Sequence, residues 1–215
     1  MKTNKEIYNI LYHYIDEDGN EGEDLREVQL MEDFSQERID KLIELINHKD
    51  TYISYQSMLI LIAWGLDEGF QELDKFIDNN LDTETKFEPH RIYGEDNVFD
   101  VISDALYIST YNTDDEHKIL PYISQFLKIY GDKFFESRLK HVLLKMSLTK
   151  TFLLDIKLAI ESAISNKRYY QASQLLPVIA KYQEKDLDIY KEKIAQFITL
   201  DKRIMYNLEE MEEYI

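Results

Sequence analysis

The segment Asp50–Asn79 constrains the fold of this chain most, because it has the pattern of two consecutive helices with different surroundings. Residues 52–64 are apolar around almost the whole circumference of a helix, and a helix of that kind is buried on more than one side. Residues 68–79 carry a single apolar stripe, and residues 64–67 separate the two helices. A buried helix followed by an amphipathic one needs further helices to pack against, so we expect a helical array.

The scarcity of turn-forming residues supports an all-α fold class. The 215 residues include only 6 glycines and 3 prolines, and long periodic runs fill most of the sequence. The sequence has no apolar run as long as the roughly eighteen residues that a membrane-spanning helix requires. Its first residues do not resemble a signal peptide, and it has no cysteine. We therefore expect a cytoplasmic protein without disulfides, thiolate nucleophiles or cysteine-bound zinc.

The net charge of −17 is distributed unevenly along the chain. Residues 1–120 hold 29 Asp and Glu against 10 Lys and Arg, a balance of −19, whereas residues 121–215 hold 13 acids and 15 bases, a balance of +2. Nucleic acids and anionic membranes bind basic surfaces, so neither is expected as a direct partner. The natural complement is a basic protein. The alternative is that the charge serves only solubility.

A second copy of the Asp50–Asn79 pattern begins at Asp96. A shift of 46 residues places Asp50 on Asp96 and Ser57 on Ser103, and matching apolar positions follow. A period in the forties with two helices per copy is typical of HEAT and armadillo repeats. The sequence therefore predicts an all-α, HEAT/armadillo-like α-solenoid of antiparallel helix pairs.

Helical periodicity continues beyond these two copies, although the repeat phase is lost in the second half. Ser35 is expected to cap a helix, and Pro177 is expected to interrupt the helix that contains it. We expect one helical-repeat domain over residues 1–215, with an acidic HEAT-like half at 1–130 and a helical C-terminal half at 131–215.

The acid-rich segment Asp16–Glu27 partly resembles a calcium-binding loop. Acidic or amide residues stand at its positions one, three, five and twelve. Position six, however, is Glu21 rather than the glycine that the sharp turn of such a loop requires. We therefore favour an acidic, solvated linker over Asp16–Asp24 rather than a calcium site, and residues 25–34 form either a short helix or an extended connector. We expect no metal and no other cofactor.

No catalytic constellation emerges from the sequence. The five histidines contain no pair spaced i,i+4, and neither a glycine-rich phosphate loop nor a Gly-x-Ser-x-Gly elbow is present. We therefore do not expect an enzyme. The alternative is a HEAT-like enzyme of the DNA glycosylase or bilin lyase type, with Asp96, Asp100 or Asp104 on a concave face. Such glycosylases place their acids in a basic groove, which the charge of residues 1–120 opposes.

The start of the second copy is the best candidate for a partner-binding surface. Asp96, Asp100, Asp104, Tyr107 and Tyr111 recur at three- and four-residue steps, so they share one side of a helix. Carboxylates pair with Lys and Arg, and tyrosine rings supply contact area. The alternative is a solvated helix face with its two tyrosines packed on a neighbour. The preceding loop and the outer face of the helix before it complete the predicted partner-binding set: Glu68, Glu72, Arg91, Tyr93 and Glu95.

Two stretches carry a resemblance to a known family. DTYISYQSMLILIAWGLDEGFQELDKFIDN resembles a HEAT-type repeat, and EPHRIYGEDNVFDVISDAL follows it within the acidic half. Together they resemble the small helical immunity proteins of bacterial polymorphic toxin and contact-dependent inhibition systems, over about residues 35–130. The resemblance implies an antitoxin that binds a basic toxin domain, often a nuclease, in the cytoplasm and blocks it. A general scaffold for protein assembly is the broader alternative.

Overall fold

The computed structural model describes residues 4–16, 18–84, 86–90, 94–182 and 185–215, and this part of the chain is mostly helical, as predicted. Backbone packing divides the chain into two compact units. Unit 1 comprises Met1–Phe87 and Ala105–Asp115, and unit 2 comprises Glu88–Asp104 and Glu116–Ile215. The division falls within helix α7 (Val98–Thr113), which contributes residues to both units. None of the described helices combines the length and apolarity needed to cross a bilayer.

Unit 1 follows the periodicity of its sequence closely. Ser35 caps a helix as predicted, because its hydroxyl accepts a hydrogen bond from the backbone N–H of Arg38 at 3.2 Å. The elements of unit 1 besides its part of α7 are α1 (Asn4–Tyr12), β1 (His13–Ile15), β2 (Glu21–Glu23), α2 (Leu25–Gln29), α3 (Gln36–Leu45), α4 (Thr51–Ala63), α5 (Asp67–Asp78) and α6 (Leu81–Glu84).

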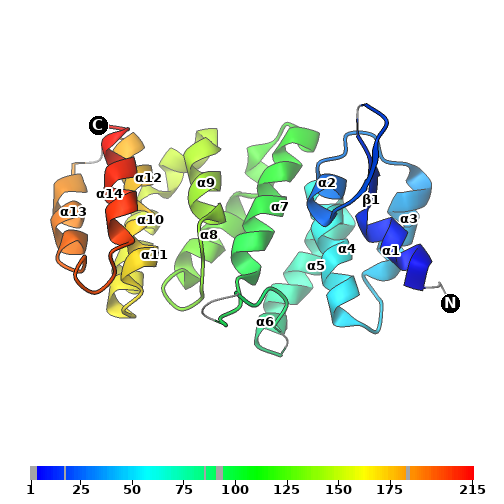
Figure 1. Ribbon diagram of the computed structural model, residues 1–215, viewed down its shortest axis with the longest axis horizontal. Coiled ribbons are helices and arrows are strands. Elements are labelled where there is room, and N and C mark those ends of the chain that lie inside the picture. The colour runs from blue at the N-terminus through cyan, green and yellow to red at the C-terminus, as the bar shows by residue number, and fades with distance from the viewer. Residues whose placement is uncertain (1–3, 17, 85, 91–93, 183–184) are drawn as a thin grey trace. The chain divides into compact units, whose positions relative to one another are not determined.

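Helices α4 and α5 are the pair that the sequence predicted, and they lie side by side (Figure 1). Every residue of α4 from Tyr55 to Ala63 is buried, which explains its apolar circumference. Gly65 ends the helix at a φ of +76°, and two hydrogen bonds, from Gly65 N to Ile62 O and from Leu66 N to Leu61 O, close it. This is a Schellman motif, and it turns the chain directly into α5.

The core of unit 1 is organised around Trp64 at the end of α4. Its side chain is 3% exposed, its ring stacks on Phe34 with the ring centres 4.2 Å apart, and its indole N–H donates to the carbonyl of Val28 at 2.9 Å. The guanidinium of Arg38 donates to the carbonyls of Ile10 and His13 at the end of α1. These contacts tie α2 to the end of α4, and α3 to α1 and β1.

The acid-rich segment predicted to be a linker, Asp16–Asp24, instead contains the turn and the second strand of a β-hairpin, and α2 follows it. Strands β1 and β2 pair antiparallel. In the turn between them, the carboxylate of Asp16 accepts hydrogen bonds from the backbone N–H of Asn20 at 2.7 Å and from its side-chain amide at 3.0 Å. Gly19 adopts a φ of +81°, a conformation that favours glycine. The described residues of this segment are largely exposed, as predicted, but the prediction of an irregular linker is wrong, because Asp16 and Asn20 build a tight turn.

Unit 2 is built from helices and two short 3₁₀ segments. Pro177 interrupts the chain as predicted: one helix ends at Ser173, and the next begins at Leu176 with the proline in its first turn, where no backbone donor is needed. The elements of unit 2 besides its part of α7 are α8 (Leu120–Ile129), α9 (Arg138–Lys145), α10 (Leu153–Ser165), α11 (Tyr169–Ser173), α12 (Leu176–Lys181), α13 (Leu187–Ala195), α14 (Ile204–Glu212) and the 3₁₀ segments Glu116–Lys118 and Ser147–Phe152.

The 46-residue repeat is visible in only one helix of the predicted pair. The shift carries α4 onto residues 97–109, which coincide with most of α7. It carries α5 onto residues 113–124, whereas α8 begins only at Leu120. The helical fold class is confirmed, whereas the HEAT-like solenoid arrangement stays a prediction.

Candidate functional site

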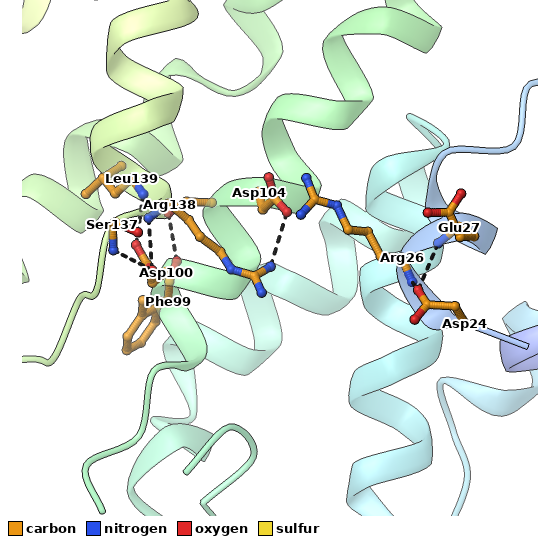
Figure 2. Close-up of polar contacts among 10 residues, drawn as sticks. Asp24, Arg26, Glu27, Phe99, Asp100, Asp104, Ser137, Arg138 and Leu139 are labelled. Atoms are coloured by element: carbon orange, nitrogen blue, oxygen red, sulfur yellow. Dashed lines mark hydrogen bonds and ion pairs between the residues drawn. The ribbon is translucent and has the colours of Figure 1, made fainter. Parts of the chain in front are cut away.

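Asp100 does not lie on an exposed surface, in contrast to the prediction. It is 0% exposed, and its carboxylate accepts hydrogen bonds from the backbone N–H groups of Ser137, Arg138 and Leu139 at 2.8–3.1 Å (Figure 2). These groups begin α9, so Asp100 supplies the cap that this helix lacks locally. Burial raises the pKa of Asp100, and the three N–H bonds oppose that rise. Its side chain is therefore structural, because none of it is accessible to a partner.

The neighbouring predicted carboxylates also make internal contacts within unit 2. Asp104 is half-buried and receives a hydrogen bond from the guanidinium of Arg138 at 3.1 Å (Figure 2). Asp96 accepts one from the backbone N–H of Glu88 at 2.9 Å. Glu95 pairs with Arg168 at 2.7 Å. The acids predicted to bind a partner therefore already have hydrogen-bond or ion-pair partners within unit 2.

The other predicted residues belong to unit 1 or lie outside the described residues. Tyr111 is 67% exposed, and its hydroxyl donates to that of Tyr107 at 3.0 Å. On α5, Glu68 is half-buried and Glu72 pairs with Lys75 at 2.9 Å. Arg91 and Tyr93 lie outside the described residues.

Unit 1 contains a concave acidic surface that the sequence analysis missed. A cavity of about 370 Å³ opens between the end of the hairpin, α2 and the segment that follows α2. We call it the acidic cavity, and its lining residues are Tyr14, Ile15, Asp16, Glu27, Leu30, Met31, Glu32 and Asp33. Four of these eight residues are carboxylates, and none is a lysine or an arginine.

Local geometry explains how the hairpin builds one wall of the acidic cavity. Tyr14 lies opposite Gly22 in the strand register, and a Cβ atom on Gly22 would come within 2.5 Å of the Tyr14 ring. The glycine therefore lets the tyrosine ring lie across its neighbouring strand. Asp24 then starts α2 by accepting hydrogen bonds from the N–H groups of Arg26 and Glu27 (Figure 2). This cap directs α2 alongside the hairpin.

Three of the carboxylates in the acidic cavity are available to a ligand. Glu27, Glu32 and Asp33 are exposed, and their side chains make no hydrogen bond or ion pair with any described residue. Asp16 differs, because its hydrogen bonds to Asn20 order the turn and lower the pKa of its carboxyl. Ile15 and Leu30 are 55% and 44% exposed, so apolar surface adjoins the free acids. The arrangement suits long cationic side chains, whose stems are apolar and whose ends are charged.

The excess negative charge of the chain lies almost entirely in unit 1. Unit 1 holds 23 Asp and Glu against 8 Lys and Arg, a net charge of −15, whereas unit 2 holds 19 acids and 17 bases, a net charge of −2. The acidic cavity thus belongs to the unit that carries almost all of the net charge. A potential of one sign focused in a hollow raises the rate at which oppositely charged partners associate.

The acidic cavity does not have the geometry of the calcium loop considered above. Glu27, at position twelve of that loop, lies on α2, and both carboxylate oxygens of Asp16 are bound by Asn20. No group of three or more His, Cys, Asp or Glu side chains within the described ranges is arranged to hold a metal ion. The sequence shows that the apolar residues Ile15 and Leu30 flank the acid-rich segment, but their exposure is visible only in the structure.

Comparisons with protein-family models, with curated proteins and with solved structures give no match to this chain.

Proposed function

We propose that this protein is an immunity protein that neutralises a basic toxin domain by binding it through the acidic cavity of unit 1. The observation that carries the proposal is the acidic cavity itself: Glu27, Glu32 and Asp33 surround a hollow and have no cation to neutralise them within the described residues. The family resemblance of the sequence supports the same kind of partner. The protein acts by stoichiometric binding in the cytoplasm rather than by catalysis.

The chemistry of the acidic cavity favours a protein partner that presents Lys or Arg beside apolar side chains. The three free carboxylates attract and pair with the cationic ends. The exposed side chains of Ile15 and Leu30 remove apolar surface from water when the stems of those residues pack on them. Together they provide both steering and contact area, which a purely solvated acidic face does not.

The α7 surface is a weaker candidate for the same partner. Asp100 is enclosed, and Asp96 and Asp104 accept hydrogen bonds within unit 2. A partner would have to break those bonds before it could pair with the carboxylates, and each loss costs free energy. Glu27, Glu32 and Asp33 in the acidic cavity require no such exchange.

Charge reversal in the acidic cavity tests the proposal. The double variant Glu27→Lys/Asp33→Lys is expected to weaken binding to the toxin domain at least about tenfold at low salt, because it replaces attraction by repulsion at the contact. The difference should shrink in high salt, where charges are screened. The measurement is calorimetric titration of the full chain with the C-terminal domain of a large secreted protein encoded beside it.

The double variant Glu68→Lys/Asp78→Lys is the matched control. It changes the net charge of unit 1 by the same amount on α5, away from the acidic cavity. Its binding should fall by a factor of about three or less, through long-range electrostatics alone. Equal losses in the two variants, or a larger loss in the control, would show that the acidic cavity is not the contact.

A further inference from the structure

Unit 2 contains a second cavity of quite different character. It has a volume of about 600 Å³, and its lining combines aromatic side chains with three lysines or arginines and three carboxylates. Phe134, Tyr169 and Tyr170 contribute rings, and Lys167, Arg168 and Arg203 contribute cations. We call it the aromatic cavity. Its size lies in the range of small-molecule sites, which are mostly apolar with a few polar groups that fix orientation.

Two of the three cations in the aromatic cavity are already neutralised. Arg168 pairs with Glu95 at 2.7 Å and also donates to the carbonyl of Gly131 at 3.1 Å. Arg203 holds the carboxylate of Asp201 in a forked contact at 2.6–3.2 Å, and its guanidinium lies 4.2 Å from the centre of the Tyr170 ring. These pairs make the arginines part of the wall rather than free ligands.

Lys167 is the exception. Its side chain is exposed at the rim and makes no ion pair or hydrogen bond with any described residue. It also lines an adjoining hollow of about 500 Å³ together with Gly131, Asp132 and Asn166. A cation at the junction of two hollows, without an internal counterion, is available to an incoming anion.

The backbone of Lys167 has an unusual conformation for this residue type. It follows α10 with a φ of +61°, and hydrogen bonds from Lys167 N to Ile164 O and from Arg168 N to Ala163 O form a Schellman motif. Glycine is the usual residue there because a side chain strains the left-handed conformation. The other described non-glycine residues with positive φ are Asn80 and Asp114, residue types that tolerate it. Strained positions of this kind are found preferentially at functional sites.

We propose that the aromatic cavity binds a small aromatic anion, with its carboxylate or phosphate on Lys167 and its ring among Phe134, Tyr169 and Tyr170. The cavity supplies aromatic rings, and Lys167 is the one lysine or arginine of its lining that makes no ion pair with a described residue. The third carboxylate of the lining, Glu136, lies 3.4 Å from the ring of His90 and is 51% exposed. This site is separate from the acidic cavity and does not depend on the function proposed for it.

Substitution of Lys167 by glycine separates binding from folding. Lys167→Gly removes the cation but relieves the backbone strain, so the melting temperature should rise by about 1–4 °C. Affinity for phenyl phosphate and phenylacetate, measured by calorimetric titration of the full chain, should fall about tenfold or more. Asn80→Gly is the control, since it relieves the same conformation in unit 1 and should leave both affinities unchanged.

Further ligands define the contribution of each part of the site. Benzyl alcohol and inorganic phosphate should each bind the wild-type chain more weakly than phenyl phosphate, because each lacks either the charge or the ring. Tighter binding of phenyl phosphate than phenylacetate, or the reverse, identifies which anion the site prefers. The proposal is overturned if neither aromatic anion binds, if Lys167→Gly binds them as well as wild type, or if inorganic phosphate binds as tightly as phenyl phosphate.

Discussion

Replacement of Asp100 by alanine should lower the free energy of unfolding by about 3 kcal/mol or more. The carboxylate is enclosed and satisfies three backbone N–H groups at the start of α9. Each buried donor left without an acceptor costs about 1–3 kcal/mol, partly relieved where water can enter. Urea denaturation followed by far-ultraviolet circular dichroism measures the loss.

Asp104→Ala is the matched control for that substitution, because it removes the same side chain one turn later on α7. Asp104 pairs with the side chain of Arg138, which is 41% exposed. Its loss should cost about 1 kcal/mol or less, as is usual for partly exposed ion pairs. Equal losses in the two variants would contradict the capping function of Asp100.

The contribution of the Asp100 carboxyl group to the free energy of unfolding should decrease as the pH rises. Burial raises the pKa of Asp100 in the folded chain above its usual 3.8. The stability contributed by the protonated form is therefore fully present below pH 3.8 and is lost as pH rises through the folded pKa. The stability of wild type relative to Asp100→Asn should fall over that interval in urea titrations. A relative stability that rises with pH would mean that the three N–H bonds outweigh burial.

Gly69→Ala should be the second strongly destabilising substitution, with a loss of about 2–3 kcal/mol. A Cβ atom at Gly69 would lie 2.5 Å from the backbone nitrogen of Ile62 and 2.7 Å from the carbonyl carbon of Leu61, both on α4. These are backbone atoms, so relief requires the two helices to move apart. Alanine would otherwise stabilise a helix by about 1 kcal/mol relative to glycine, and the steric clash exceeds that gain.

The exposed position Gln71 on α5 provides the control, because Gln71→Ala adds no atom near α4 and should leave the melting temperature nearly unchanged. Thermal denaturation of the three proteins measures the difference. If Gly69→Ala melted at or above the wild-type temperature, α4 and α5 would not pack as closely as the structure shows.

The parts of the fold that sequence could predict are those decided by neighbours along the chain. The apolar circumference of α4, the cap at Ser35 and the break at Pro177 all depend on residues within one or two turns. The hairpin escaped prediction because each strand has only three residues, too few for a visible alternation. Its order comes from a turn that Asp16 and Asn20 build.

The candidate site was misplaced for a similar reason. Helical spacing correctly put Asp100 and Asp104 on neighbouring turns of α7, and spacing alone classes both as solvent-facing. The donors that enclose Asp100 are 37–39 residues away in the sequence, so its burial depends on tertiary packing. The acidic cavity likewise requires the hairpin to fold beside α2, which composition could not reveal.

The position of Trp64 gives the chain an internal spectroscopic probe. It is the sole tryptophan of the sequence, and its indole is enclosed in the core of unit 1 against Phe34 and Val28. Its emission therefore reports on the surroundings of α4, whereas circular dichroism sums over the helices of both units. Denaturation curves recorded by the two signals would coincide if the units unfold together and separate if they do not. One unmodified protein can thus reveal how cooperatively its two units unfold.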